Sequence, residues 1–324
     1  MNRNIYVIVE HLRRQVADIT YIMLAAARLL AQGTGGKVVA VLLGHNAQEL
    51  ASDLAADQVL YLDHPTLTDF TSDAYQKALV DLIGNNTPRA GLFGHTSVGM
   101  DVVSGLSARL GLPLVSQCRN VRVADGVLKF ISQICGGKIM AEGDLPSPTA
   151  LMTIVPGGFK PEQGRSAQPP EVTPVTVPTL EGLRVTLKQY IEPEAGDVDI
   201  SKEPILVSVG RGIQNQDNIE LAQELADALG GVVCASRPVV DQGWLPTTRL
   251  VGKSGKSVKP KVYLALGISG APEHVEAITD SETIIAINTD PIAPIFNFAK
   301  YGAMVDLFDL VPALTEKAKS IKLT

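Results

Sequence analysis

Residues 262–271 read Val-Tyr-Leu-Ala-Leu-Gly-Ile-Ser-Gly-Ala, and this stretch decides the fold of the second half of the chain. The apolar run 262–266 predicts a strand that is buried on both faces, as in a parallel sheet covered by helices. Glycine allows the close turn that follows, and the pattern at 271–278 predicts a helix directly after it. This order predicts a strand, turn and helix unit whose first free N–H groups suit a pyrophosphate, although Ser269 is equally well explained as an ordinary N-cap.

The same alternation of strands and helices extends on both sides of this stretch. In the second half we expect strands at 205–209, 232–234, 283–287 and 303–307 and helices at 218–229 and 311–320. In the first half we expect strands at 5–9, 38–43, 59–62, 90–93 and 150–155 and helices at 18–31, 47–54, 71–83 and 99–110. Residues 114–123 and 128–134 flank Ala124-Asp125-Gly126 and predict a β-hairpin. The fold class is therefore α/β, with an N-terminal parallel-sheet domain that carries a hairpin insertion and a C-terminal Rossmann-like parallel-sheet domain.

A proline-rich segment separates the two halves. Residues 156–178 contain six prolines with glycines among them, which predicts an extended connector that is neither helix nor central strand. A β-like piece follows at 183–191, and we place the domain boundary near residues 197–203. The predicted domains are residues 1–200, including the connector, and residues 201–324.

Composition excludes several classes of protein. The 324 residues are 45% hydrophobic and 19% charged, which excludes a disordered chain. The net charge of -6 argues against nucleic-acid binding. Three widely spaced cysteines predict neither a disulfide scaffold nor a zinc site, and we expect a reducing compartment. The sequence begins without a signal peptide and has no apolar run long enough to span a membrane, so we expect a cytoplasmic protein without direct membrane insertion.

Polar or glycine-rich residues follow each predicted strand of the second domain. Any one of them is explained as a turn residue, but together they predict a ligand site, because ligands of open α/β sheets bind outside the carboxyl ends of the strands. These segments are Gly210-Arg211-Gly212, Ser236-Arg237-Pro238, Gly267-Ile268-Ser269-Gly270, Asn288 and Asp306.

Other motifs limit what the site binds. The dinucleotide pattern GxGxxG is absent, and residues 252–257, Gly-Lys-Ser-Gly-Lys-Ser, lack the spacing of a phosphate-binding P-loop. His274 falls in the first turn of the predicted helix; it is either a surface histidine or a donor that faces the ligand. Neither paired carboxylates nor a nucleophile beside a base is visible. The residues alone therefore predict a nucleotide-type cofactor site without obvious acid/base machinery, and no metal site.

The second domain resembles the flavin-binding domain of the electron transfer flavoprotein alpha subunit, also named FixB. The first domain resembles the family more loosely, through Val9-Glu10-His11, residues 104–115 and residues 156–161, Pro-Gly-Gly-Phe-Lys-Pro. In the second domain the matching segments keep their order and spacing; they are Val207–Gly212, Ala235–Asp241, Val251–Lys256, Tyr263–His274, Ala286–Asn288, Ala293–Phe296 and Tyr301–Phe308.

The resemblance implies an FAD site in the second domain. It implies that Arg211 and the loop Ser269, Gly270, Ala271, Pro272, Glu273 and His274 hold the pyrophosphate and ribityl chain. Asn288, Asp306 and Leu307 would hold the adenosine, and Ser236, Arg237, Val251, Gly252, Lys253 and Ser254 would lie against the isoalloxazine. Ser254 would place its hydroxyl near flavin N5. Arg237 and His274 would supply positive or donor groups that favour the reduced, negatively charged flavin.

Two departures from the family pattern concern redox tuning. Many members have Gln-Thr-Gly where this chain has Lys253-Ser254-Gly255, and Ile-Gln-His where it has Pro272-Glu273-His274. Serine keeps the hydroxyl. We expect Lys253 to raise the flavin potential and Glu273 to offset part of that effect, while the FAD assignment is unchanged.

The resemblance further implies an electron carrier that forms a heterodimer with a beta subunit, built through the first domain, which carries no cofactor of its own. It would accept electrons from flavin dehydrogenases such as the acyl-CoA dehydrogenases of fatty acid beta-oxidation and pass them to a quinone oxidoreductase at the membrane. One alternative is an electron-bifurcating flavoprotein that oxidises NADH. A stand-alone NAD(P)-dependent oxidoreductase would need an acidic residue where Arg237 stands. A nucleotide-binding module without a redox role is the remaining class.

Overall fold

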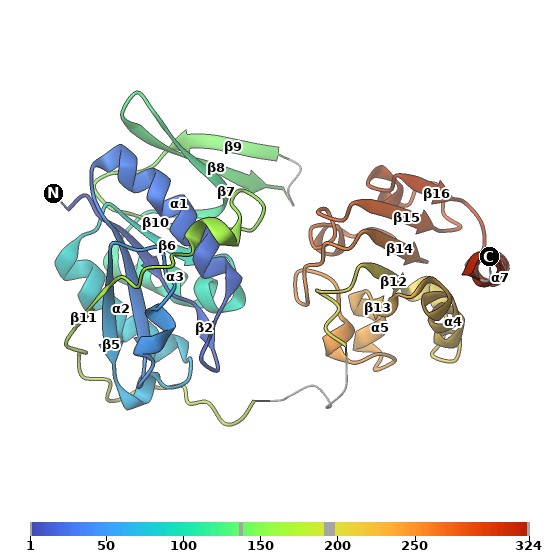
Figure 1. Cartoon of the computed structure of the whole chain (residues 1–324), viewed down its shortest axis with the longest axis horizontal. Helices are drawn as coiled ribbons and strands as arrows, with labels where there is room; N and C mark the ends of the chain where they lie inside the picture. Colours follow the sequence, from blue (N-terminus) through green and yellow to red (C-terminus); the bar gives the residue numbers. More distant parts are fainter. Residues whose placement is uncertain (1, 136–138, 191–197, 323–324) are drawn as a thin grey trace. The chain divides into compact units, whose positions relative to one another are not determined.

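The computed structural model describes residues 2–135, 139–190 and 198–322. The chain divides into two compact units, Met1–Tyr190 and Ile191–Thr324, which we call unit 1 and unit 2 (Figure 1). Each unit is an α/β domain with its own sheet and its own core. The predicted fold class is therefore confirmed.

Unit 1 is built on a nine-stranded sheet of order β11-β5-β4-β1-β6-β10-β7-β8-β9. All neighbours from β11 to β7 are parallel, and β7, β8 and β9 pair antiparallel. In sheet order the strands are β11 (Glu171–Pro174), β5 (Gln58–Asp63), β4 (Val38–Gly44), β1 (Ile5–Ile8), β6 (Ala90–Gly94), β10 (Ala150–Ile154), β7 (Leu114–Ala124), β8 (Val127–Ile134) and β9 (Ile139–Asp144).

Helices cover both faces of the parallel part of this sheet. Helix α1 (Asp18–Thr34) packs on one face, and α2 (Ser72–Asn86) and α3 (Ser97–Leu110) pack on the other (Figure 1). Strand β4 is buried along its whole length, as expected for a central parallel strand. A two-strand ribbon, β2 (His11–Leu12) and β3 (Gln15–Val16), joins β1 to α1.

The predicted hairpin is confirmed as β7 and β8, with positive φ angles of 53° and 76° at Asp125 and Gly126. Strand β9, which the sequence analysis missed, extends this hairpin. The predicted helix at 47–54 was wrong, because only a single 3-10 turn, η1 (Gln48–Ala51), forms there. Another 3-10 turn, η2 (Pro65–Leu67), follows β5.

The proline-rich segment is part of unit 1 and more than a connector. It forms a 3-10 turn, η3 (Pro161–Gly164), against α1 and then the edge strand β11. An edge position suits this strand, because Pro174 has no N–H to donate to a second neighbour. The predicted β-like piece was wrong for residues 183–190, where Arg184 N–H donates to Asp73 and the Tyr190 hydroxyl donates to Asp69 in place of strand pairing. Residue 191 lies outside the described residues.

Unit 2 has a five-stranded, fully parallel sheet of order β13-β12-β14-β15-β16. Three of its strands have the predicted bounds. The strands are β12 (Ile205–Val209), β13 (Val232–Ala235), β14 (Val262–Leu266), β15 (Thr283–Ile287) and β16 (Tyr301–Ala303). The helices and 3-10 turns are η4 (Arg211–Ile213), α4 (Ile219–Leu229), α5 (Arg237–Asp241), η5 (Thr247–Arg249), α6 (Pro272–Val275), η6 (Pro294–Asn297) and α7 (Leu307–Lys322).

Two predicted elements of unit 2 needed correction. The fifth strand ends at Ala303, and Asp306 instead starts helix α7, where its side chain accepts a hydrogen bond from Phe308 N–H at 3.0 Å. The helix expected at 271–278 is only the four-residue α6. The domain boundary at residue 200 stays a prediction, since residues 191–197 lie outside the described residues; Ile200 itself is buried in the core of unit 2.

The contact between η3 and α1 is tight enough to test. A Cβ added at Gly164 would lie 1.9 Å from the carbonyl oxygen of Tyr21, so either the connector or the helix must move. We expect Gly164→Ala to lower the free energy of unfolding of unit 1 by about 1–3 kcal/mol, measured by urea unfolding followed by circular dichroism.

Gly84→Ala is the matched control. This glycine lies inside α2, and its added Cβ would meet only Leu110 Cδ2 at 3.5 Å, an ordinary contact. Alanine is a better helix former, so this variant should match the wild type or exceed it by about 0.5–1 kcal/mol. Equal stability of the two variants would contradict the packing argument.

Candidate functional site

The carboxyl ends of the unit 2 strands meet at one edge of the sheet, because all five strands run parallel. Ser236 follows β13, Gly210 follows β12, Gly267 follows β14 and Asn288 follows β15. The structure therefore brings together the segments that the sequence analysis assigned to one site. Asp306 lies farther along, at the start of α7.

Three glycines allow two of these segments to touch through their backbones. A Cβ at Gly210 would lie 2.3 Å from the carbonyl oxygen of Gly267, and one at Gly212 would lie 2.7 Å from Gly267 Cα. Gly267 has a φ of 61°, which glycine adopts without strain. The N–H of Gly212 donates to the Gly267 carbonyl at 3.1 Å. No larger residue fits at these positions without moving the backbone.

The loop after β14 is held from behind by the segment after β15. Gly270 has a φ of 88°, and an added Cβ would lie 2.3 Å from the backbone nitrogen of Ile295. Ile295 N–H donates to the Ser269 carbonyl at 3.0 Å, and the Asn288 side-chain amide donates to the Ile268 carbonyl at 3.0 Å. Asn288 therefore supports the loop directly. The side chain of Ser269 stays exposed.

The predicted pyrophosphate helix is corrected. Helix α6 has only four residues and starts with Pro272, which has no N–H. A single turn sums few peptide dipoles, so a helix macrodipole contributes little here. The exposed donors of this loop are those of a glycine turn, with Ser269, Ala271 and Glu273 at its surface.

Residues 251–256 form a tight loop beside α6. Val251 and Lys256 are bridged, and Gly252 N–H donates to the Lys256 carbonyl at 3.2 Å. Gly252 has a φ of 148°, a conformation that side chains disfavour. Lys253 N–H donates to the Glu273 carbonyl at 2.8 Å. This loop and the start of α6 are thus joined through their backbones.

The tip of this loop carries exposed polar groups. Lys253 and Ser254 are both exposed, and Arg237, at the start of α5, places Nη1 3.5 Å from the Ser254 hydroxyl. Arg237 Nε also pairs with Asp241 at 3.3 Å, while 66% of the Arg237 side chain is exposed. A cation and a hydroxyl are therefore presented side by side to a ligand at this edge.

The side chain of His274 is buried, so the surface position that the sequence left open is wrong, while its contact with a ligand stays a prediction. The residue is only 6% exposed. Nδ1 lies 3.1 Å from the Val251 carbonyl oxygen and Nε2 lies 2.9 Å from the Tyr263 hydroxyl. Burial lowers the pKa of His274 from its usual 6.5 to about 4, against a smaller opposite effect of the Val251 carbonyl. A neutral imidazole with both nitrogens engaged supplies no positive charge to a ligand in this structure.

Three other predicted residues turn their side chains inward. Ser236 is 6% exposed, Val251 is 1% exposed, and Leu307 is 5% exposed with its side chain in the core under α4 and α7. Any contact that these residues make with a ligand is therefore made mainly by their backbone. Arg211, in η4, is exposed at the same edge as Gly210.

Sequence reasoning missed two residues that support the site. Tyr263 is fully buried in β14, and nothing in its apolar strand marks it as a partner of His274. Asp199 accepts a hydrogen bond from Lys256 Nζ at 2.7 Å and also binds Ser201, and these donors hold the pKa of Asp199 well below its usual range. The partners in each of these two contacts are far apart in sequence, so the sequence gave no signal for either contact.

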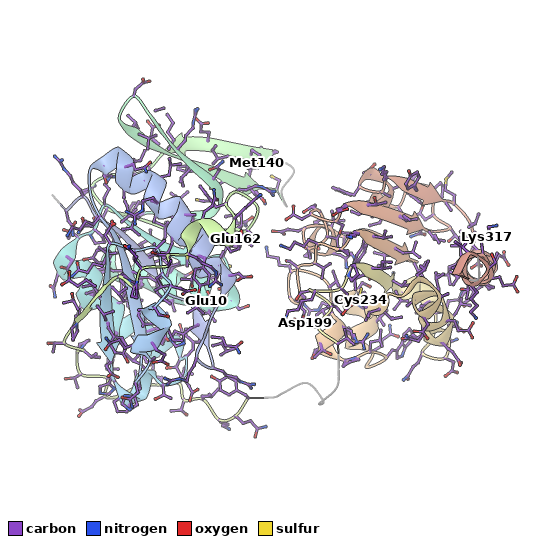
Figure 2. The ribbon with its side chains drawn as sticks, in the orientation of Figure 1. Glu10, Met140, Glu162, Asp199, Cys234 and Lys317 are labelled. Atoms are coloured by element: carbon purple, nitrogen blue, oxygen red, sulfur yellow. The ribbon has the colours of Figure 1, made fainter. Side chains whose placement is uncertain are left out.

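The thiol of Cys234 lies inside unit 2 (Figure 2). Burial raises its pKa from 9.0 to about 12, so it is a structural residue and no nucleophile at neutral pH. Within residues 2–135, 139–190 and 198–322 there is no cluster of acidic, histidine and cysteine side chains that would hold a metal ion. None of the helices in the same ranges has both the length and the apolar character needed to cross a membrane.

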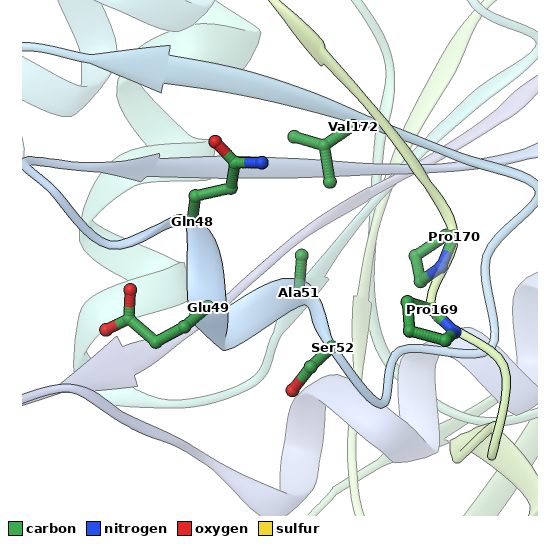
Figure 3. A pocket seen from close by; sticks show the side chains of 7 residues that line it. All are labelled: Gln48, Glu49, Ala51, Ser52, Pro169, Pro170 and Val172. Carbon is green, nitrogen blue, oxygen red and sulfur yellow. The ribbon is translucent and has the colours of Figure 1, made fainter.

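Unit 1 contains a separate open cavity of about 440 Å³ (Figure 3). Glu49 is the only charged residue of its lining, which otherwise consists of Gln48, Ala51, Ser52, Pro169, Pro170 and Val172. Glu49 turns away from Val172 in Figure 3. The polar side chains of its lining, Gln48, Glu49 and Ser52, all belong to η1 or the residue after it, so they do not converge from opposite walls on a small ligand.

Fold and sequence pattern together define a two-domain α/β protein with a candidate ligand site at the carboxyl edge of its second sheet. Family models match both units: the electron transfer flavoprotein domain over residues 5–180 and the electron transfer flavoprotein FAD-binding domain over residues 199–279. The chain belongs to the electron transfer flavoprotein alpha-subunit family, and its cofactor is FAD.

Curated relatives extend over the whole chain. The electron transfer flavoprotein subunit alpha of Thermoanaerobacterium thermosaccharolyticum is 36% identical over 99% of both chains. That of Bacillus subtilis is 33% identical over 100% of this chain and 99% of its own. The acryloyl-CoA reductase electron transfer subunit beta of Anaerotignum propionicum is 36% identical over 99% of this chain and 96% of its own.

The buried neutral His274 makes the stability of unit 2 depend on pH. Its pKa is about 4 in the folded chain and near 6.5 in the unfolded chain, so between these values the unfolded chain binds the proton more tightly. Stability is complete above pH 6.5 and decreases as the pH falls toward 4, by about 3 kcal/mol in total. The groups that face the ring are the Tyr263 hydroxyl and the Val251 carbonyl.

Urea unfolding from pH 7.5 to 4.5 checks this expectation. The single tryptophan, Trp244, lies in unit 2, so its fluorescence reports the unfolding of that unit. We expect His274→Asn to flatten the pH dependence, whereas the control His64→Asn, in unit 1, keeps the wild-type slope. A slope that is the same in all three proteins would contradict the assignment.

Proposed function

We propose that this protein is the FAD-containing alpha subunit of a heterodimeric electron carrier. In this proposal it accepts electrons from flavin dehydrogenases such as acyl-CoA dehydrogenases and delivers them to a quinone oxidoreductase. The observation that carries the proposal is the exposed trio of Arg237, Lys253 and Ser254 at an edge whose supporting backbone is fixed by glycines. A carrier needs such an accessible edge and no acid/base pair.

The residues at this edge fit the parts of FAD. Arg211 and Ser269–Glu273 offer exposed donors for the pyrophosphate and ribityl chain. Asn288 and the start of α7, with Asp306, offer polar groups for the adenosine. Arg237, Lys253 and Ser254 offer a hydroxyl and two cations for the isoalloxazine. FAD bound there supplies one- and two-electron transfer.

Arg237 has the central electrostatic role in this proposal. Its guanidinium is always protonated and Nη1 lies 3.5 Å from the Ser254 hydroxyl. A fixed cation lowers the free energy of a reduced, negatively charged flavin more than that of the oxidised ring. Asp241, at 3.3 Å from Arg237 Nε, orients the guanidinium and neutralises part of its field.

The proposed beta-subunit partner fits the surface of unit 1. Strands β8 and β9 carry four exposed apolar side chains that a lone subunit would leave in water, and Figure 2 labels one of them, Met140. They are Val127, Ile134, Ile139 and Met140, each at least 42% exposed and distributed along the two strands. Exposed apolar groups of this kind favour a protein interface. We therefore expect low solubility when the chain is expressed alone.

One relative supports a second candidate function. The protein of Anaerotignum propionicum is named as an electron transfer subunit of acryloyl-CoA reductase. This chain would then serve as the electron-transfer subunit of an acyl-CoA reductase, with the same FAD site. The two functions differ in the direction of electron flow between the flavin and the acyl-CoA.

The visible absorption spectrum of the protein co-expressed with its beta subunit tests the proposal. We expect flavin bands that do not bleach when NADH is added. Bleaching by NADH would instead favour an electron-bifurcating complex. A folded but colourless complex would overturn the carrier and leave a nucleotide-binding module.

The variant Gly270→Ala makes the test specific to this site. The added Cβ would lie 2.3 Å from the Ile295 backbone nitrogen, so the loop cannot keep its shape. We expect at least a tenfold loss of bound flavin, measured by the absorbance ratio of flavin to protein. Gly84→Ala, in unit 1, should keep its flavin. Full flavin content in Gly270→Ala would mean that FAD is held elsewhere.

The charge of Lys253 should raise the flavin potential. One cation near the ring favours the reduced form, so we expect Lys253→Gln to lower the midpoint potential by on the order of 20 mV in a spectroelectrochemical titration. Glu273→Gln should shift it the opposite way by a smaller amount. Lys259→Gln removes the same charge outside the predicted site and should leave the potential unchanged. An unaltered potential in Lys253→Gln would contradict this role.

A further inference from the structure

The two lysines of the segment 252–257 have different surroundings. Lys253 is exposed at the tip of the 251–256 loop, whereas Lys256 Nζ donates to Asp199 Oδ1 at 2.7 Å and 37% of its side chain is exposed. Asp199, labelled in Figure 2, lies 57 positions earlier in sequence, within residues 198–202, which we call the entry segment of unit 2. The ion pair therefore joins the entry segment to the loop that carries Lys253 and Ser254.

The entry segment is itself held firmly in unit 2. Ile200 is fully buried and belongs to the same hydrophobic core as Val251. The N–H and the hydroxyl of Ser201 donate to Asp199 Oδ1 at 3.3 and 2.8 Å, which restricts the rotamer of the carboxylate. The hydrogen bond from Lys256, followed by those from Ser201, holds the pKa of Asp199 well below its usual range. The acceptor for Lys256 is thus charged and oriented at neutral pH.

Lys256 is the residue that closes the loop. Its N–H donates to the Leu250 carbonyl at 2.8 Å, and its own carbonyl accepts from Gly252 N–H at 3.2 Å. Gly255 N–H donates to the Gly252 carbonyl at 2.9 Å, and a Cβ added at Gly255 would lie 2.4 Å from the Leu250 carbonyl oxygen. The exposed tip of the loop lies between these contacts. A displacement of Lys256 therefore moves the peptide groups of the tip.

The free energy of this ion pair acts locally. A half-exposed pair contributes little to the global free energy of unfolding, because water screens it and both side chains lose freedom. Opening a short surface loop costs far less than global unfolding, so a contribution of this size changes the open fraction of one loop measurably. The pair is thus suited to fixing the loop and adds little to the stability of unit 2 as a whole.

We propose that Asp199 and Lys256 form a positioning pair for the flavin: the entry segment holds Lys256, and Lys256 holds the closed loop so that Lys253 and Ser254 face the bound ring. The inference rests on the proposed function for the placement of the isoalloxazine beside this loop. It gives Lys256 a role through the loop backbone, whereas Lys253 acts through its own charge.

A charge-neutral double variant separates positioning from a long-range effect of charge. Asp199→Ala/Lys256→Met removes one carboxylate and one ammonium, so the net charge is unchanged while the link is lost. A pure charge effect would move the midpoint potential in opposite directions in the two single variants and cancel in the double variant. A loss of positioning persists in the double variant, because the loop is no longer joined to the entry segment.

Lys202→Met is the matched control. Lys202 Nζ pairs with the same carboxylate at 3.6 Å, but it belongs to the entry segment itself, and 81% of its side chain is exposed. This variant removes a lysine charge beside Asp199 and leaves the link to the loop in place.

Amide hydrogen exchange of the full chain, co-expressed with its beta subunit, reports on the loop independently of electron transfer. In the double variant we expect exchange in peptides covering residues 252–256 to accelerate about three- to fivefold, with little change in β12 and β14. Each single variant should show most of this acceleration, because either one breaks the same link. The midpoint potential of the double variant should fall, as for Lys253→Gln, because a less fixed cation stabilises the reduced flavin less. Lys202→Met should keep the wild-type exchange.

Several outcomes would overturn the proposal. Wild-type exchange in the double variant would refute the positioning role, and equal acceleration throughout unit 2 would show that the pair only stabilises the domain. Accelerated loop exchange with an unchanged midpoint potential would mean that the loop does not position groups toward the flavin. If the double variant does not fold, Asp199→Asn, which keeps a neutral acceptor, decides by the same measurements. A colourless wild-type complex would refute the proposed function, while the exchange result would still test the link between Asp199 and Lys256.

Discussion

The backbone contact between Gly210, Gly212 and Gly267 is the constraint on which the site in unit 2 depends. The backbones after β12 and β14 are so close that a Cβ added at Gly210 would lie 2.3 Å from the Gly267 carbonyl oxygen, so these two loops form one surface. The loop 267–271 then needs support from behind, which Asn288 and Ile295 give through hydrogen bonds of 3.0 Å. The side chains that remain exposed at this edge, such as those of Arg237, Lys253 and Ser254, can be substituted without disturbing the sheet.

The sequence was sufficient for the central strands, because β12, β14 and β15 are mostly apolar and largely buried on both faces. It was insufficient where tertiary contacts override local pattern. Residues 47–54 have a helical pattern, but Ala47 N–H donates to the Tyr61 hydroxyl and only one 3-10 turn forms. Strand β9 was missed because none of its residues is buried: four of the six are exposed, so its sequence lacks a clear apolar alternation.

For the site, too, one part could be predicted from the sequence and another part could not. Which loops meet could be predicted, since parallel strands bring their carboxyl ends to one edge. The direction of individual side chains could not, and His274 is the clearest example. Its ring is buried and lies within hydrogen-bond distance of Tyr263, eleven positions earlier in sequence and buried in β14. A single sequence contains no signal for such a pairing, because Tyr263 looks like any apolar strand residue.

The exposed residues and the buried residues of the site therefore contribute different chemical groups. The outer layer, with Arg237, Lys253 and Ser254, holds charge and hydroxyl groups where solvent and a ligand reach them. The inner layer, with Tyr263, His274 and the Val251 carbonyl, holds neutral groups that satisfy one another away from water. Keeping the imidazole neutral matters for this division, since a buried proton on Nε2 would face the Tyr263 oxygen as a second donor and would add a charge behind the loop. The buried layer therefore adds no charge near neutral pH, and the charges at this edge are those of the exposed side chains.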